Sequence, residues 1–233
     1  MRKLFLAILL VITVAASATT IHDVQFTTDA GTDGTYPSPL DGQEVTITGI
    51  VSATGVDGGD KFFMTDPAGG AWNGIYVFDW SILPALGDMV EVTGTITEYY
   101  GLTEITYCSG TIISSGNAIP AASIVTTGQM SDGVSAESYE GCLVKVMNAT
   151  CETAADDYGK FAVNDNTGTC HVNDLFDVYP EPEVGEQFAY IMGMGSYDYG
   201  DYTIEPRTLA DVVSGTPVSN SKKSWGKIKS IYK

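Results

Sequence analysis

The chain has 233 residues, of which 44% are hydrophobic and 17% charged, so it can bury a substantial core and is not a long disordered segment. It carries 29 acidic but only 11 basic side chains, and this excess argues against tight phosphate binding, which depends on cations. Its 2 His and 4 Cys show no CxxC-like spacing, so no zinc centre is expected.

Residues 1–18 predict a secretory signal peptide. Arg2 and Lys3 precede an apolar run over residues 4–14, and Ala16-Ser17-Ala18 offers a cleavage site. The run is too short to span a bilayer. We therefore expect a mature chain that starts near Thr19 and is secreted, to the periplasm or the extracellular space.

Strand patterns dominate the rest of the chain. Residues 44–52 (EVTITGIVS) and 89–97 (MVEVTGTIT) alternate apolar and polar side chains. Gly49 and Gly94 fall inside these strands, where a glycine indicates a bulge or the sharp bend of a small barrel. No run of helical period exceeds ten residues between residues 19 and 215.

An internal repeat with an offset of 98 or 99 residues predicts two similar units. The repeated landmarks are Lys61-Phe62 with Lys160-Phe161, Val77-Phe78-Asp79 with Leu175-Phe176-Asp177, Leu86-Gly87-Asp88 with Val184-Gly185-Glu186, and Tyr100-Gly101 with Tyr199-Gly200. We predict a first barrel with its linker over residues 19–128, the linker being the small-residue stretch 114–128. A second barrel is predicted over 129–215, and a spacer with a basic tail over 216–233.

The ordered pieces DGQEVTITGIVSAT, KFFMTDP, NGIYVFD and LGDMVEVTGTITEYYGLTEI resemble the OB-fold domain that accompanies secreted bacterial nucleases of the endonuclease/exonuclease/phosphatase type. The resemblance covers residues 41–106 and implies an all-β, five-stranded Greek-key barrel. It places the strands at 45–53, 61–65, 75–78, 89–97 and 102–107. It implies a domain and not an enzyme, because no residues remain for a catalytic segment. The second copy departs from the pattern, with KFAVNDNTG in place of KFFMTDPAGG.

On such a barrel, ligands meet the second and third strands and the loops between strands 1–2 and 4–5. Phe62 and Phe63 are adjacent, so in a strand one of the two rings must point away from the core. The alternative for any of these aromatic side chains is ordinary packing. The candidate ligand-binding residues are Phe62, Trp72, Tyr76, Tyr99, Tyr100, Tyr197 and Tyr199.

The net charge of the chain indicates which class of partner is favoured. Residues 19–221 hold four basic and 29 acidic side chains, a net charge of −25, which repels a polyanion. A glycan, cell-surface or protein partner is therefore the primary expectation. Nucleic-acid binding beside a secreted nuclease and extracellular self-assembly are the alternatives. No catalytic role is expected, since neither His22 nor His171 has a nucleophile motif nearby.

Two predicted loops between the first and second strands are acidic. Asp57 and Asp60 lie in the first copy, and Asp156 and Asp157 in the second. Such oxygen ligands can hold extracellular Ca²⁺ weakly, whereas the alternative is that they are solvated turn residues. No other cofactor is expected.

Export favours disulfides. The four cysteines allow three pairings. We predict Cys151–Cys170 as a staple of the second barrel and Cys108–Cys142 as a tie between the barrels, and free thiols are the alternative.

The end of the chain, SKKSWGKIKSIYK, has apolar residues three to four apart with lysines between them, which is typical of a short basic amphipathic helix. It is a candidate contact with an anionic surface, and the alternative is a disordered tail or one docked on the acidic body. The predicted contact residues are Trp225, Lys227, Ile228 and Lys229.

Overall fold

A computed structural model describes residues 18–56, 61–78, 82–131, 133–178 and 180–215. The predicted signal peptide up to residue 17, the basic tail and Asp57 and Asp60 lie outside these ranges. The described residues form an all-β protein with two short α-helices. No helix among them has the length and apolar character needed to cross a bilayer.

The N-terminal half is a closed five-stranded barrel, the N-terminal barrel. Its strands are β1 (Glu44–Val56), β2 (Lys61–Thr65), β3 (Gly74–Phe78), β4 (Met89–Tyr99) and β5 (Leu102–Ser114). They pair in the order β1-β2-β3-β5-β4, and β4 returns to β1. The β3–β5 pair is parallel and the other pairs are antiparallel. All five strands lie where the sequence predicted them, and the topology is OB-like.

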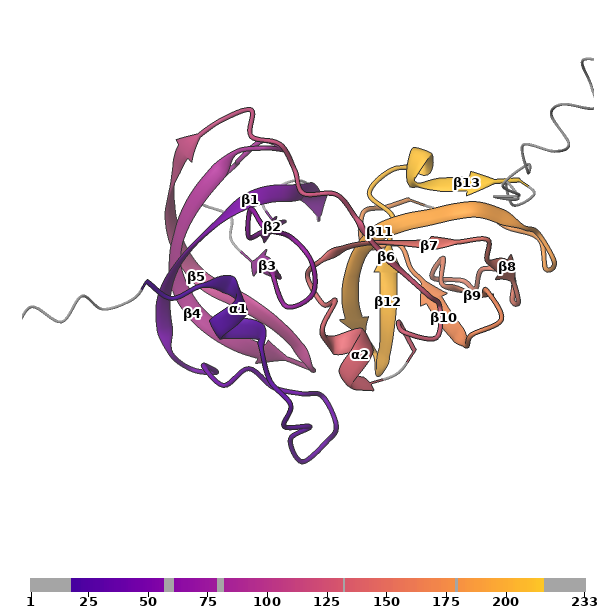
Figure 1. Ribbon diagram of the computed structural model, residues 1–233, viewed down its shortest axis with the longest axis horizontal. Coiled ribbons are helices and arrows are strands. Elements are labelled where there is room, and N and C mark those ends of the chain that lie inside the picture. The colour runs from indigo at the N-terminus through magenta and orange to yellow at the C-terminus, as the bar shows by residue number, and fades with distance from the viewer. Residues whose placement is uncertain (1–17, 57–60, 79–81, 132, 179, 216–233) are drawn as a thin grey trace, which may run out of the picture.

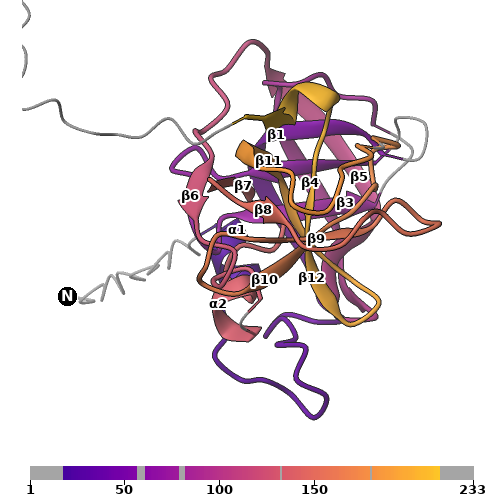
Figure 2. The same cartoon turned by 90° about the vertical axis from the view of Figure 1, so that its right-hand side faces the viewer.

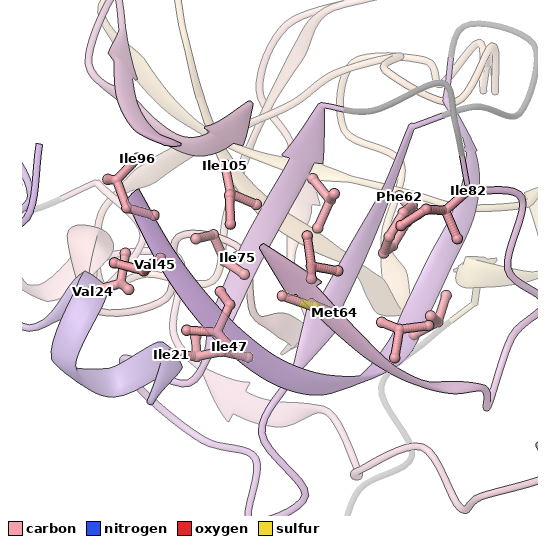
Figure 3. Packing of buried hydrophobic residues seen from close by; sticks show 14 residues of the cluster. Ile21, Val24, Val45, Ile47, Phe62, Met64, Ile75, Ile82, Ile96 and Ile105 are labelled. Atoms are coloured by element: carbon pink, nitrogen blue, oxygen red, sulfur yellow. The ribbon is translucent and has the colours of Figure 1, made fainter. Parts of the chain in front are cut away.

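Alternate side chains of these strands fill the barrel, as the period-two pattern requires (Figure 3). Helix α1 (Ile21–Gln25) covers one end of this core, because Ile21 and Val24 are fully buried beside Ile47 and Val45. A capping box starts the helix: the Thr20 hydroxyl accepts from the Asp23 N–H, and the Asp23 carboxylate accepts from the Thr20 N–H.

The second half is an eight-stranded sheet, the C-terminal sheet (right in Figure 1, pink to yellow). Its strands are β6 (Ser123–Val125), β7 (Leu143–Met147), β8 (Thr150–Cys151), β9 (Phe161–Asn164), β10 (Thr169–Val172), β11 (Phe188–Asp198), β12 (Asp201–Glu205) and β13 (Val212–Ser214). Helix α2 (Gly133–Glu137) lies between β6 and β7, and a 3-10 turn, η1 (Leu209–Asp211), precedes β13. Strand β6 pairs with β7, so part of the predicted linker is a strand of this sheet.

The pairings of the N-terminal barrel recur in the C-terminal sheet. Strands β9–β10, β11–β12 and β7–β11 are antiparallel, and β10–β12 is parallel. The counterpart of β1 is interrupted, because β7 and β8 are separated by Asn148, whose φ is 57°, and Ala149. The second half is therefore an OB-like half-barrel.

One landmark of the sequence repeat is misplaced. Phe62 pairs with Val77, 15 residues later, whereas Phe161 pairs with Val172, 11 residues later. The shorter β9–β10 turn moves the third strand forward in the chain. Phe176 consequently lies beyond β10 and not at the end of a strand.

The N-terminal barrel and the C-terminal sheet meet through a third apolar core, the junction cluster. It consists of Ala53, Val56, Phe63, Tyr76, Phe176, Val178 and Met194. The rings of Phe63 and Phe176 lie 6.0 Å apart across it. In Figure 2 the C-terminal sheet stands in front of the barrel. Phe63 of β2 and Tyr76 of β3 are buried in the junction cluster. The outer face of β2–β3 is therefore covered.

The predicted disulfides are absent, and all four cysteines are thiols. Cys151 and Cys170 both pair with Val163, from opposite sides of β9, so two strand spacings of about 4.8 Å separate them. A disulfide requires Cα atoms closer than about 7 Å. Cys108 donates to the Ile105 carbonyl inside the barrel, while Cys142 donates to the Gly70 carbonyl at the junction.

Candidate functional site

Two hairpins present the same tyrosine-glycine turn. Tyr100 and Gly101 join β4 to β5 with φ of 52° and 96°, and Tyr199 and Gly200 join β11 to β12 with φ of 48° and 96°. Two successive positive φ angles define a type I′ turn, where asparagine is the usual first residue. A tyrosine there costs on the order of 1 kcal/mol. In both copies the strained position displays a ring, with Tyr100 85% and Tyr199 97% exposed.

The two turns converge. A Cβ added to Gly101 would lie 2.7 Å from Cε1 of Tyr197, so the first turn rests against the second hairpin. Edge-to-face pairs organise the aromatic rings, since Tyr99 and Tyr100 have centroids 4.9 Å apart, and so do Tyr197 and Tyr202. We call Tyr99, Tyr100, Tyr197, Tyr199 and Tyr202 the tyrosine rim.

A cleft of about 310 Å³ opens beside the rim. Its walls include His171 of β10 and Tyr197, Asp201 and Tyr202 of the β11–β12 hairpin, with the backbone of Gly34 and Gly133 opposite. The volume is at the lower end for a small-molecule site and suits one planar group. The Asp201 carboxylate is held by Lys160 Nζ at 2.5 Å, and His171 Nδ1 lies 3.7 Å from the same oxygen.

Buried carboxyl groups lie directly behind the rim. The Tyr202 hydroxyl donates to Glu137 at 2.9 Å, and the Thr103 N–H donates to Glu140 at 2.9 Å. Burial raises the pKa of Glu137 to about 8, and burial together with the Glu137 charge raises the pKa of Glu140 well above its ordinary value. Burial also raises the pKa of Glu98, although hydrogen bonds from Ser38 and Thr103 oppose the shift. We call Glu98, Glu137 and Glu140 the carboxyl cluster.

The structure separates the predicted aromatic residues into two groups. Tyr99, Tyr100, Tyr197 and Tyr199 come together at the rim, and the first, second and fourth are exposed. Phe62 is 1% exposed inside the barrel and Tyr76 is 5% exposed in the junction cluster, so neither ring is accessible to a ligand in this structure. Trp72 is half-buried against Phe26.

The outward ring of the Phe62–Phe63 pair is Phe63, as the strand period requires, but the C-terminal sheet covers it. Tyr202 belongs to the second of the two tyrosine clusters that the sequence places at the turns between the fourth and fifth strands, whereas the sequence did not single out Glu137 or Glu140. The sequence feature that points to this site is the internal repeat, because Tyr-Gly recurs at the end of both fourth strands.

The basic side chains of the described body are engaged with neighbours. Lys61 lies over the Phe78 ring and Lys145 over the Tyr190 ring, at 4.5 and 4.2 Å. Lys160 is paired with Asp201, and Arg207 with Asp211. The described residues therefore contain no basic track along which phosphates could run.

The acidic loop of the second copy acts as a turn. The Asp156 carboxylate accepts the N–H groups of Tyr158 and Lys160, as turn-forming aspartates do. Asp157 lies in the same loop. Among the residues that the structure describes, no three His, Cys, Asp or Glu side chains are arranged to hold a metal ion.

No family model matches the chain. Endonuclease YhcR of Bacillus subtilis (strain 168) is 32% identical over 183 residues, which cover 73% of this chain but 15% of that protein. The chain thus corresponds in length to a small part of this relative.

Two DNA complexes are among the similar solved structures. "Structure of murine DNA binding protein bound with ds DNA" has a TM-score of 0.32 and 11% identity, covering 70% of this chain and 90% of that one. The Ifi202 HINa domain with 20-bp dsDNA has a TM-score of 0.36 and 13% identity, covering 71% and 92%. Scores this low carry no structural argument.

The comparisons correct the ranking of partners made from charge. The expectation of a glycan, cell-surface or protein partner placed nucleic acid second, whereas the sequence relative is a nuclease by name. A net charge of −25 treats the body as a uniform anion, whereas stacking on a base depends on exposed rings and not on cations. The chain is similar, over 183 of its residues, to part of a Bacillus endonuclease.

Proposed function

We propose that this chain is an exported, non-catalytic module of two tandem OB-fold copies that binds single-stranded nucleic acid beside a nuclease activity. The observation that carries the proposal is the convergence of two exposed Tyr-Gly turns, with a cleft beside the second turn that Tyr197, Gly200 and Tyr202 line. Similarity to part of an endonuclease supports the partner class. In an OB-fold the loop between strands four and five is one of the two that meet oligonucleotides.

Single strands fit the rim better than duplexes. A base must be unstacked before a tyrosine ring can cover its face, and stacking accepts every base. Tyr197 and Tyr202 of the tyrosine rim line the cleft, while Tyr99, Tyr100 and Tyr199 expose their rings to solvent. With the described cations already engaged, stacking supplies most of the binding free energy in the body.

Replacing the turn tyrosines with asparagine tests the proposal. Because asparagine suits the first position of a type I′ turn, Tyr100→Asn and Tyr199→Asn keep or raise the melting temperature while removing the rings. Each lost stack is worth about 1–3 kcal/mol, so the double variant weakens binding of a labelled oligo(dT) by at least roughly tenfold. Fluorescence anisotropy at low salt measures the affinity.

Tyr158→Ala is the matched control, since Tyr158 is 79% exposed but lies in the β8–β9 loop. It should bind as the wild type does. Unchanged affinity in the double variant, or no binding of single-stranded DNA or RNA by the wild type even at low salt, contradicts the proposal.

The basic tail has a separate, electrostatic role in this proposal. Five lysines follow residue 221 in the sequence. If they contact phosphates, the logarithm of affinity falls against the logarithm of salt concentration with a slope of about −3.5 for single strands. Deleting residues 222–233 should flatten the slope toward zero while the tyrosine effect persists. A slope that the deletion leaves unchanged would show that the tail does not touch the ligand.

A further inference from the structure

The carboxyl cluster lies where the N-terminal barrel meets the C-terminal sheet. Glu98 comes from β4 of the barrel, and Glu137 and Glu140 come from α2 and the residues after it. Glu140 is 1% exposed and spans the junction, because it accepts from Thr103 of β5 while its backbone bridges to Gly195 of β11. The three acids therefore belong to the contact between the two halves.

The hydrogen bonding of the cluster is incomplete. Oε2 of Glu140 and Oε2 of Glu98 are buried and have no hydrogen-bond partner among the described residues. A buried carboxylate oxygen without a donor is costly, whereas a carboxylic acid carries its own proton and no charge. The arrangement suits the neutral form of at least one acid.

The surroundings are acidic on every side. Lys61 is the cation that acts on this neighbourhood, and it acts on Glu104. The Tyr202 hydroxyl already donates to Glu137. The titratable groups contributed by the packed elements are Glu98 of β4, Glu104 of β5, Glu137 and Glu140 around α2, Cys142 before β7, Tyr197 of β11, Tyr202 of β12, and Asp33 and Asp41 of the segment before β1.

We propose that bound protons on the carboxyl cluster hold the two halves together, and that ionisation of Glu137 and Glu140 loosens the junction. Two or three negative charges would then face one another, with no ion pair to any of the three acids among the described residues, and separation into water relieves the repulsion. Opening breaks the Thr103–Glu140 hydrogen bond and the apolar contacts of Phe63 and Tyr76. The pH range is neutral to mildly alkaline.

The opening has a consequence for the ligand, which rests on the proposed function. The outer face of β2–β3 is one that OB-folds use for single strands, and here it carries Phe63 and Tyr76 beneath the C-terminal sheet. The closed form offers the tyrosine rim alone. The open form adds this aromatic face.

Cys142 provides a probe of the junction that needs no ligand. Its thiol is buried and donates across the junction to the Gly70 carbonyl, whereas Cys170 is buried in the core of the C-terminal sheet. The experiment follows alkylation of both by iodoacetamide with mass spectrometry, at pH 6 and pH 9. The ratio of the two rates removes most of the ordinary rise in thiolate with pH.

We expect the Cys142/Cys170 ratio to rise at least tenfold in the wild type and to change by less than twofold in Glu140→Gln, which keeps the acceptor for Thr103 but cannot ionise. Glu137→Gln is the second variant should the first fail to fold. Glu91→Gln, which replaces an exposed acid of β4, should behave as the wild type does. A constant ratio in the wild type, or an equal rise in the glutamine variants, overturns the proposal whether or not nucleic acid binds.

Discussion

At the scale of single residues, two glycines determine how closely the halves approach. A Cβ on Gly74 would lie 2.1 Å from the carbonyl oxygen of Gly141, and a Cβ on Gly141 would lie 2.6 Å from the backbone of Gly74. These are backbone contacts that cannot be relieved by moving a side chain. The junction therefore requires glycine on both sides.

A pair of alanine substitutions separates the free-energy cost of this close contact from the cost of placing alanine in the left-handed backbone conformation. Gly141 and Gly42 have similar φ angles, +70° and +75°, but a Cβ at Gly42 would meet no atom within 4 Å. Gly42→Ala should cost about 1–2 kcal/mol for the left-handed conformation alone. Gly141→Ala should cost about 1–3 kcal/mol more, because the halves must move apart.

Urea denaturation measures both free energies of unfolding. Equal losses for Gly141→Ala and Gly42→Ala would mean that the junction tolerates the added methyl group and that the close approach is not a constraint.

At the scale of strands, the alternation of apolar and polar side chains made the N-terminal barrel predictable. Period-two patterns in β1 and β4 and the resemblance of the intervening pieces placed all five strands. The same reasoning required one of Phe62 and Phe63 to leave the barrel core, and Phe63 does. The alternation pattern does not predict what packs on the outer face of a strand. The burial of Phe63 and Tyr76 by the second half was therefore not predictable.

The second copy was less predictable for local reasons. Its β9–β10 turn is shorter, and Asn148 and Ala149 interrupt the counterpart of β1. The cysteines show the same limit, because pairing Cys151 with Cys170 required knowledge of the strand order that puts β9 between them. At the site, the sequence supplied the Tyr-Gly repeat but not the contact of Gly101 with Tyr197, which depends on docking.

At the scale of the whole molecule, buried acids link stability to pH. Burial raises the pKa of Glu104 and of Glu205 to about 7, and that of Glu137 to about 8. The folded state therefore binds protons more tightly than the unfolded chain does. This contribution is complete below the ordinary glutamate pKa and is lost as the pH rises through 7 to 8.

The melting temperature should consequently be lower at pH 8.5 than at pH 6.0, by roughly 5–10 °C for a chain of this size. Surface carboxylates are already ionised at pH 6.0, so their mutual repulsion changes little over this interval. Differential scanning calorimetry at constant ionic strength gives the two values. A melting temperature that is equal or higher at pH 8.5 would mean that these acids are ionised in the folded protein throughout.

The chain order of the pairings has a consequence during synthesis. Every strand of the N-terminal barrel lies before residue 115, so the barrel can close while the C-terminal sheet is still on the ribosome. Until β11 emerges, Phe63 and Tyr76 face solvent on a nascent chain. The partly synthesised chain is most prone to aggregate during this interval. A chaperone that binds exposed aromatic side chains would act at that stage.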